Sequence, residues 1–289
     1  MVPGPNGALT KRCQSNKTPL KSLSIRHNQE QQMTSDETQI SEEQYIQGLI
    51  ELHGGLDRQG PGDSVFSNQM LSVIKEALPA SPRIADIGCG SGIGALMLAE
   101  AFQTQVKAVD FSRDFLDQMM VSAKERGLES LIDPIECDMG ALDWSKGSID
   151  LLWSEGAAYN LTFEGALKAW RPFLSDGGMA VISELSYFSE PMPSDVKEFW
   201  ENAYPDIATE EVNKARAVSS GFEVIAVHRL PSKAWWDNYY NPLINKMNEY
   251  KGQGNRAMEA VIRDTEQEIA FFKAHSDHYG YSFYLLKAV

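Results

Sequence analysis

Glycines and acids at the ends of two apolar runs are the residues best suited to chemistry. Residues 84–87 are apolar except for Asp86, and 88–92 follow directly as Gly-Cys-Gly-Ser-Gly. A second apolar run, 106–109, ends on Asp110. Glycines let a ligand approach the backbone, and free N–H groups at a helix start favour an anionic group. Asp110 is placed to accept two ribose hydroxyls. The arrangement predicts a site for a nucleoside-bearing cofactor.

Two cofactor classes compete for this turn. A dinucleotide site requires Gly-x-Gly-x-x-Gly or Gly-x-Gly-x-x-Ala, and the run that starts at Gly88 has Ile93 at the third position. The run 90–95 fits, although it begins late relative to the strand. S-adenosylmethionine sites place an acid two residues before the first glycine, as Asp86 stands here. This carboxylate suits an ammonium group and would repel a pyrophosphate. The residues favour S-adenosylmethionine, with NAD as the alternative.

Alternating strands and helices must position these residues. Strands are expected at 84–87, 106–109, 132–137, 149–153 and 179–185. Helices are expected at 93–101, after the cap Ser112, at 163–170 and at 210–220. Such alternation gives right-handed crossovers and a parallel sheet with helices on both faces. The late strands 222–230 and 281–289 are expected to close the sheet as an antiparallel pair. The predicted fold is α/β, a doubly wound, mostly parallel, seven-stranded Rossmann-like sheet.

Two helices are expected before the first strand. Ser41 and Gln44 have the spacing of a capping box for a helix that ends at His53. Asp63 or Ser64 is expected to cap a second helix that runs to about residue 78.

Two long insertions, 186–206 and 231–279, do not belong to the minimal sheet. Both are rich in aromatic residues, which include Trp200 in the first and Trp235 in the second. Insertions of this length in compact domains usually form lids or binding walls. Most single aromatic residues are expected to pack the caps onto the body, whereas the cluster as a whole is expected to border a ligand.

Charge and composition restrict the partners. The net charge is −14, and residues 1–32 carry five basic residues against one acid, so the remainder has a net charge of −18. An acidic body repels phosphate backbones, which disfavours DNA and RNA as substrates. No run approaches the roughly 20 apolar residues of a membrane span. The three cysteines suggest neither a disulfide framework nor a metal site, which favours a cytoplasmic location.

The first residues differ in character from the body. Residues 1–32 lack hydrophobic periodicity and are rich in Ser, Asn, Gln, Lys and Pro, so 1–40 are predicted to be a disordered leader. A targeting signal is the alternative, although no amphipathic arginine face is visible. Residues 41–289 are predicted to form a single domain with cap insertions at about 186–206 and 231–279.

Over roughly 41–289 the chain resembles the class I S-adenosylmethionine-dependent methyltransferases. The general motif is Asp86 with the glycine turn and Asp110. Four further segments resemble a bacterial subgroup of uncharacterised small-molecule enzymes: 58–62, 153–160, 199–205 and 279–281. The general motif indicates the methyl donor and says almost nothing about the acceptor.

The resemblance implies a role for each matching residue around the cofactor. Gly88, Gly90 and Gly92 would hold the methionine portion, with Asp86 near its ammonium group. Asp110 would bind the ribose, and Phe111 would border the adenine. Asp138 would bind the adenine amino group, and the Met139 N–H would meet a ring nitrogen. Arg58 is also expected to bind the cofactor, and Glu155 is expected beside the reactive sulfonium.

The acceptor side is less defined by sequence. Glu155 and Tyr159 are the candidate catalytic residues, and Tyr159, Asn160, Trp200 and Trp235 are the candidate substrate contacts. His53 and His228 are the histidines to test next, although a lone histidine more often packs or lies at the surface. The family's Asn/Asp-Pro-Pro-Tyr motif is absent at 154–157, where the residues are Ser-Glu-Gly-Ala. That absence argues against DNA adenine and protein glutamine as targets.

Methyl transfer to a small molecule is therefore the expected function. The reaction is an in-line displacement that chiefly needs alignment of acceptor and methyl carbon, and a general base only if the acceptor arrives protonated. An aromatic wall beside Glu155 suggests an amine or another cationic N, S or O nucleophile as acceptor. The alternatives are an S-adenosylmethionine-binding enzyme of different chemistry and a non-catalytic cofactor-binding protein. The product would be S-adenosylhomocysteine, and the oligomeric state, monomer or homodimer, does not follow from sequence.

Overall fold

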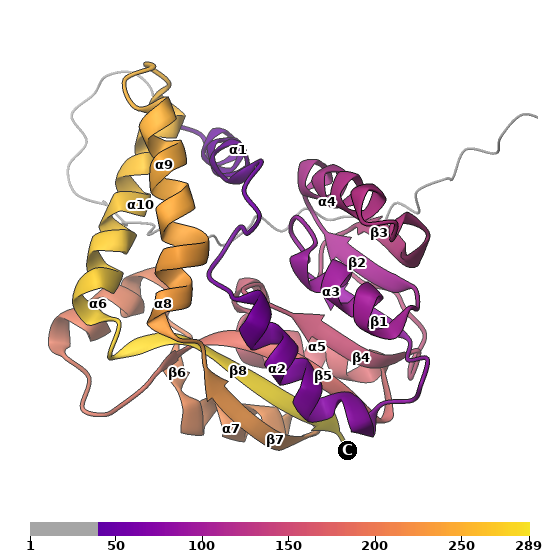
Figure 1. The fold of residues 1–289 in the computed structure, drawn as a ribbon. Helices are drawn as coiled ribbons and strands as arrows, with labels where there is room; N and C mark the ends of the chain where they lie inside the picture. The colour runs from indigo at the N-terminus through magenta and orange to yellow at the C-terminus, as the bar shows by residue number, and fades with distance from the viewer. Residues whose placement is uncertain (1–39) are drawn as a thin grey trace, which may run out of the picture.

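The computed structural model describes residues 40–289. The predicted leader, 1–40, therefore lies outside the described residues except for its last residue. A mixed sheet forms the centre (Figure 1). Its strands are β1 (Ile84–Ile87), β2 (Val106–Asp110), β3 (Ile132–Glu136), β4 (Ile149–Ser154), β5 (Leu174–Tyr187), β6 (Ala208–Thr209), β7 (Phe222–Arg229) and β8 (Tyr279–Ala288).

The strand order confirms the predicted sheet. The seven main strands run β3-β2-β1-β4-β5-β8-β7, and the two-residue β6 is an addition beside the end of β5. β1 to β5 pair in parallel, whereas β8 is antiparallel to both β5 and β7. The carboxyl ends of β1, β2 and β4 therefore meet at one edge, where ligands bind in open α/β sheets.

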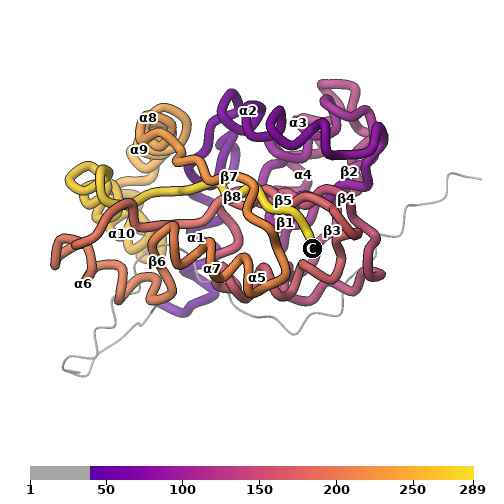
Figure 2. The backbone as a smooth tube through the Cα atoms, turned by 90° about the horizontal axis from the view of Figure 1, so that it is seen from below, coloured from indigo at the N-terminus to yellow at the C-terminus, as the bar shows by residue number. Residues whose placement is uncertain are grey.

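Helices cover both faces of the sheet, as Figure 2 shows from below. The helices of the body are α2 (Ser64–Ile74), α3 (Ile93–Phe102), α4 (Arg113–Glu125), α5 (Phe163–Trp170) and α7 (Glu210–Ser219). Side chains alternate between the faces along each strand. Ile84 joins the hydrophobic cluster of α2 and α3, and its neighbour Ala85 joins the cluster of α5 and α7. Short 3-10 turns occupy Lys75–Ala77, Glu129–Leu131, Ala158–Leu161 and Arg171–Phe173.

The two insertions form a helical cap at one end of the sheet. The first contains α6 (Ser194–Ala203). The second contains α8 (Ser232–Trp235), a π-helix (Trp236–Tyr240), α9 (Asn241–Tyr250) and α10 (Arg256–His275). α1 (Glu42–His53) packs against α9 and α10, far from its sequence neighbours in the body (Figure 1). The cap therefore combines the first described helix with a late insertion.

Local sequence explains why α1 begins and ends as it does. The Ser41 side chain accepts from the Gln44 N–H at 3.1 Å, and the Gln44 side chain accepts from the Ser41 N–H at 2.9 Å. This is the predicted capping box, which satisfies two N–H groups that a helix start leaves free. The helix ends at His53, immediately before two glycines.

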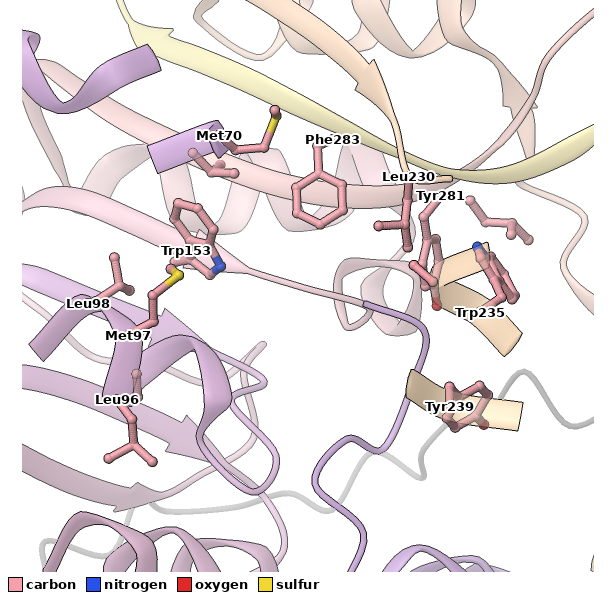
Figure 3. Packing of buried hydrophobic residues seen from close by; sticks show 14 of the residues in the cluster. Met70, Leu96, Met97, Leu98, Trp153, Leu230, Trp235, Tyr239, Tyr281 and Phe283 are labelled. Carbon is pink, nitrogen blue, oxygen red and sulfur yellow. The ribbon is translucent and has the colours of Figure 1, made fainter. Parts of the chain in front are cut away.

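One hydrophobic cluster continues from the sheet into the cap. Trp153 of β4, Phe283 and Tyr281 of β8, and Trp235 of the cap follow one another in Figure 3. The Trp235 ring stacks on Phe272 with centroids 4.2 Å apart. Continuity of this kind is consistent with the predicted single domain of 41–289, which stays a prediction. No helix within residues 40–289 is long and apolar enough to cross a membrane.

Candidate active site

A cavity opens where β1, β2 and β4 end, between the sheet and the cap. It measures about 1360 Å³ with its solvent-filled mouth included. Its walls come from α1, the 57–61 loop, the turn after β1, the ends of β2 and β4, the π-helix and α10. The cavity thus joins the predicted cofactor site to the cap.

The glycine turn after β1 needs its glycines for two reasons. Gly88, Gly90 and Gly92 have φ of +74°, +53° and +89°, which L side chains rarely adopt. A Cβ on Gly90 would also lie 2.4 Å from Gln59 Oε1, and one on Gly92 would lie 2.2 Å from Met119 Cγ. Gly88 and Gly90 line the cavity, whereas Gly92 is absent from its lining. The turn is therefore compressed between the body and the 57–61 loop.

Asp110 stabilises this turn through hydrogen bonds and also lines the cavity. Its Oδ2 accepts the Gly90 N–H at 2.9 Å, and its Oδ1 accepts the Ser112 N–H at 2.9 Å. Burial raises the pKa of Asp110 to about 6. The carboxylate is therefore mostly charged at neutral pH, and each oxygen keeps a lone pair for a further donor.

Asp86 lies deeper, with 2% of its surface exposed. Burial and the nearby charge of Glu155 raise the pKa of Asp86 well above its ordinary value, although the Ala95 N–H partly favours the charged form. A positively charged ligand in the cavity would favour the carboxylate. Asp86 thus lies where the sequence predicts a partner for an ammonium group, and its role stays a prediction.

Glu155 lies at the cavity, but its oxygens are already occupied. Oε2 pairs with Arg58 Nη1 at 3.0 Å, while Oε1 accepts from Ser67 Oγ at 2.7 Å and Trp153 Nε1 at 2.9 Å. The Arg58 and Glu155 side chains are only 10% and 12% exposed. Because its charge is paired, Glu155 is poorly suited to hold a cationic acceptor. In the structure Glu155 holds the Arg58 and Trp153 side chains by these contacts.

The 57–61 loop is hydrogen-bonded to Ser91, just before α3 begins. Gln59 Oε1 accepts the Ser91 N–H at 2.8 Å, and Ser91 Oγ donates to the Asp57 carbonyl at 2.7 Å. Gln59 and Asp57 line the cavity, and neither was predicted as a site residue. The only sequence signal was their place in the 58–62 segment or beside it, without a role.

A histidine–tyrosine pair lies on the cap side of the cavity. His53 Nδ1 is 2.8 Å from the Leu49 carbonyl, which can only accept, so Nδ1 carries the hydrogen. His53 Nε2 therefore accepts from the Tyr239 hydroxyl at 3.1 Å. Burial lowers the pKa of His53, which keeps the ring neutral. Tyr239 belongs to the π-helix, a local irregularity that often occurs at functional sites.

Glu268 of α10 is the acid on the cap side. Its Oε1 accepts from the Tyr240 hydroxyl at 2.9 Å. Burial raises the pKa of Glu268 to about 7. No lysine or arginine of residues 40–289 forms an ion pair with it. This side chain was not predicted, because it lies in an insertion without a motif.

The structure brings most predicted site residues together. Those that line the cavity are Arg58, Asp86, Gly88, Gly90, Asp110, Phe111, Met139, Glu155, Tyr159 and Asn160. Asp138 lies next to Met139, but its Oδ1 caps the local turn by accepting the Gly140 N–H at 2.8 Å. His53 lines the cavity, whereas His228 is exposed on β7.

Trp200 and Trp235 do not line this cavity, which corrects their placement as substrate walls. Each is 2% exposed and belongs to the hydrophobic core. Large apolar rings gain most by full burial, and both pack on other aromatic rings of the cap. The walls at this end are Tyr159, Tyr239 and Tyr281, and Trp235 supports Tyr281 from behind at 5.0 Å between ring centroids (Figure 3).

Comparison with known proteins agrees with this geometry. Residues 84–178 match the family described as "Methyltransferase domain", from β1 to the first part of β5. The matched segment contains the glycine turn, Asp110 and Glu155. Residues 84–178 therefore match a methyltransferase domain, and the fold of the described chain is that of solved S-adenosylmethionine-dependent methyltransferases.

Curated relatives share only part of their length with this chain. Ribosomal protein arginine N-methyltransferase rmt3 of Schizosaccharomyces pombe is 31% identical over 140 residues, which cover 47% of this chain and 24% of that protein. Malonyl-[acyl-carrier protein] O-methyltransferase 2 of Coxiella burnetii is 25% identical over 175 residues, which cover 61% of this chain and 66% of that protein. Their names indicate different acceptors.

Solved structures resemble nearly the whole described chain in fold. YjhP from E. coli has a TM-score of 0.73 at 18% identity, covering 84% of this chain and 100% of that one. A methyltransferase from Geobacter sulfurreducens, solved with S-adenosylhomocysteine, has a TM-score of 0.71 at 18% identity and covers 84% and 98%. The [4+2]-cyclase SpnF has a TM-score of 0.66 at 17% identity and covers 85% and 93%. At these identities the likeness shows the fold.

Proposed function

We propose that this protein transfers a methyl group from S-adenosylmethionine to a small-molecule acceptor. The observation that carries the proposal is one continuous cavity with two chemically different ends. One end has the glycine turn with Asp86 and Asp110, and the other has three tyrosines together with Glu268 of the cap. A donor and an acceptor held in one cavity are brought into the alignment that the reaction requires.

The residues at the first end suit the cofactor part by part. Asp86 provides negative charge for the methionine ammonium group. Arg58 is the cationic side chain of the cavity lining within residues 40–289; one of its N–H groups is used by Glu155, and its further N–H donors suit the methionine carboxylate. Asp110 has acceptor capacity for the ribose hydroxyls, and Phe111 and Met139 offer apolar contact to the adenine. These roles, with Asp138 for the adenine amino group, remain proposals.

The chemistry follows from alignment more than from a reactive side chain. S-adenosylmethionine supplies a methyl carbon bonded to a positively charged sulfur. Fixing the geometry of such a displacement is worth several kcal/mol, on the order of 7–11 in well-oriented systems. The cap supplies one wall of the cavity, whose mouth stays open to solvent, so the size of the acceptor is limited by the space beneath α1 and α10. That limited space favours a small molecule over a folded protein.

Two measurements test the proposal. Calorimetry of the purified protein with S-adenosylmethionine, S-adenosylhomocysteine and NAD should show binding of the first two and none of NAD. Incubation with methyl-labelled cofactor and a metabolite extract should then give S-adenosylhomocysteine and one labelled small molecule, identified by mass spectrometry. Binding of NAD alone, or label found only in protein, would contradict the proposal.

Chemistry other than methyl transfer is the second candidate. The fold likeness to SpnF, named as a [4+2]-cyclase, extends over 93% of that chain, so this architecture is compatible with another reaction. A non-catalytic cofactor-binding protein is the remaining alternative. S-adenosylhomocysteine formation separates both from the proposal: a second chemistry converts a substrate while the cofactor stays intact, and a binding protein converts nothing.

A further inference from the structure

We infer that the acceptor is a primary or secondary amine with an apolar body, held by the Glu268 carboxylate among the tyrosines that line the cavity. The inference rests on the proposed function and names the substrate class of the same site. The sequence-based hypothesis placed a cationic acceptor beside Glu155. Because Arg58 pairs with Glu155, the inference assigns that role to Glu268 instead.

Charge is the first support. Glu268 lines the cavity, and only the Tyr240 hydroxyl is seen to bond it, through Oε1. No lysine or arginine of residues 40–289 forms an ion pair with Glu268, and two basic partners of its helix are used by other acids: Lys251 pairs with Glu266, and Arg263 pairs with Asp264. Glu268 is half-buried and exposes its remaining surface to the cavity, and a carboxylate that has lost much of its hydration without a counter-charge is costly unless a cation joins it. An ammonium ligand would supply that cation.

The tyrosines are the second support. Tyr239 and Tyr281 line the same cavity as Glu268, and the charge of Glu268 acts on both of them. Burial and this charge raise the pKa of both phenols well above its ordinary value, so the rings stay neutral. The faces of neutral electron-rich rings attract a cation and repel an anion, so these ring faces favour an ammonium group over a carboxylate.

The third support is the apolar wall that faces these groups. α1 contributes Ile46, Leu49 and Ile50 to the cavity. A ligand that is only a small polar cation would leave these side chains in contact with water or empty space. An amine carried on a hydrocarbon or aromatic body would cover them.

Glu268 also fits the proton transfer that an amine requires. The bound ammonium group gives one proton to the Glu268 carboxylate and becomes a neutral amine. The amine nitrogen then forms a bond to the methyl carbon while the carbon–sulfur bond breaks, and the electron pair of that bond goes to sulfur. The products are a methylated ammonium ion, S-adenosylhomocysteine and protonated Glu268, which returns its proton to solvent.

Isosteric probes and charge variants test this inference. 2-Phenylethylamine, 2-phenylethanol and phenylacetate are titrated calorimetrically into protein saturated with S-adenosylhomocysteine. Turnover of each is followed with S-adenosylmethionine by mass spectrometry. The variants are Glu268→Gln, which keeps the acceptor oxygen for Tyr240, Glu268→Asp, which keeps the charge, and the exposed control Glu266→Gln on the same helix.

The wild-type protein should bind the amine roughly 10- to 100-fold more tightly than the alcohol or the acid. Glu268→Gln should abolish that preference without changing the affinity for S-adenosylhomocysteine, Glu268→Asp should retain part of it, and Glu266→Gln should retain all of it. Equal or weaker binding of the amine in the wild-type protein overturns the inference, and so does an undiminished preference in Glu268→Gln. If the protein binds no S-adenosylmethionine, the proposed function fails instead, which the first calorimetric titration reveals separately.

Discussion

Glu184 on β5 offers a test of the electrostatics of this fold. Its side chain is 1% exposed, and neither carboxyl oxygen has a hydrogen bond of ordinary geometry within residues 40–289. Burial raises the pKa of Glu184 to about 8 from 4.5, although Tyr204, the Leu185 N–H and Arg216 partly favour the charged form, and Asp206 opposes it. The folded protein therefore holds this group protonated at neutral pH.

The sign and size of the effect follow from linkage. Because folding raises this pKa, the stabilising contribution is complete below pH 4.5 and is lost as the pH rises towards about 8. The loss is about 1.4 kcal/mol per pH unit within that window, or roughly 3 kcal/mol between pH 6 and pH 9. A loss of that size corresponds to roughly 6–12 °C in Tm for a chain of this length.

Urea unfolding at pH 6 and at pH 9 measures this loss. Glu184→Gln cannot ionise, so it should lose roughly 3 kcal/mol less than the wild-type protein between the two pH values. Asp86, Asp110 and Glu268 also have raised pKa values and remain in both proteins, so their contributions cancel in the comparison. The exposed β7 variant Glu223→Gln should behave as wild type. An equal loss in the wild type and in Glu184→Gln would refute the reasoning.

Three further variants probe the cofactor side. Asp110→Ala should weaken S-adenosylmethionine binding by about 2–3 kcal/mol through two lost ribose hydrogen bonds, and unchanged affinity in calorimetry would exclude the ribose role. A thermal melt must accompany it, since Asp110 also accepts the Gly90 and Ser112 N–H groups. Glu155→Ala leaves Arg58 without its partner, so it should cost about 3–5 kcal/mol in urea unfolding and slow methyl transfer more than it weakens cofactor binding. Equal losses in the rate of methyl transfer and in cofactor affinity would contradict the idea that Glu155 acts by positioning Arg58 and Trp153. Gly90→Ala places a Cβ 2.4 Å from Gln59 Oε1 at φ +53°, so it should lower Tm and cofactor affinity together, whereas an exposed Gly127→Ala should lower Tm alone.

The sequence predicted the parts of the site whose residues lie close together along the chain. The glycine turn and Asp110 occupy the ends of adjacent strands, so a motif of 25 residues contains most of the geometry. The Ser41 capping box and the strands of the sheet are likewise set by neighbours in sequence. Parallel pairing then brings the strand ends together without further information.

Contacts between distant segments could not be predicted in the same way. Arg58 and Glu155 are 97 residues apart, and His53 and Tyr239 are 186 apart. Nothing local distinguishes Trp235, which faces the core, from Tyr239 one helical turn later, which faces the cavity. Glu268 lies on a 20-residue amphipathic helix whose buried side is decided by the packing of α1. The hydrophobic pattern predicts that each of these residues lies on a helix, but it does not predict which distant residues the side chain contacts.

The position of β8 has a consequence for how this protein is made. β8 follows every other strand in sequence, yet it lies between β5 and β7 and is buried along nearly its whole length. During synthesis β7 has no partner in the sheet until β8 has been translated, about 50 residues later, which at 5–20 residues per second takes several seconds. For that interval the exposed edges of β5 and β7 are open to pairing with other chains. The helices α8 to α10 are translated within that interval, before β8 can close the sheet between β5 and β7.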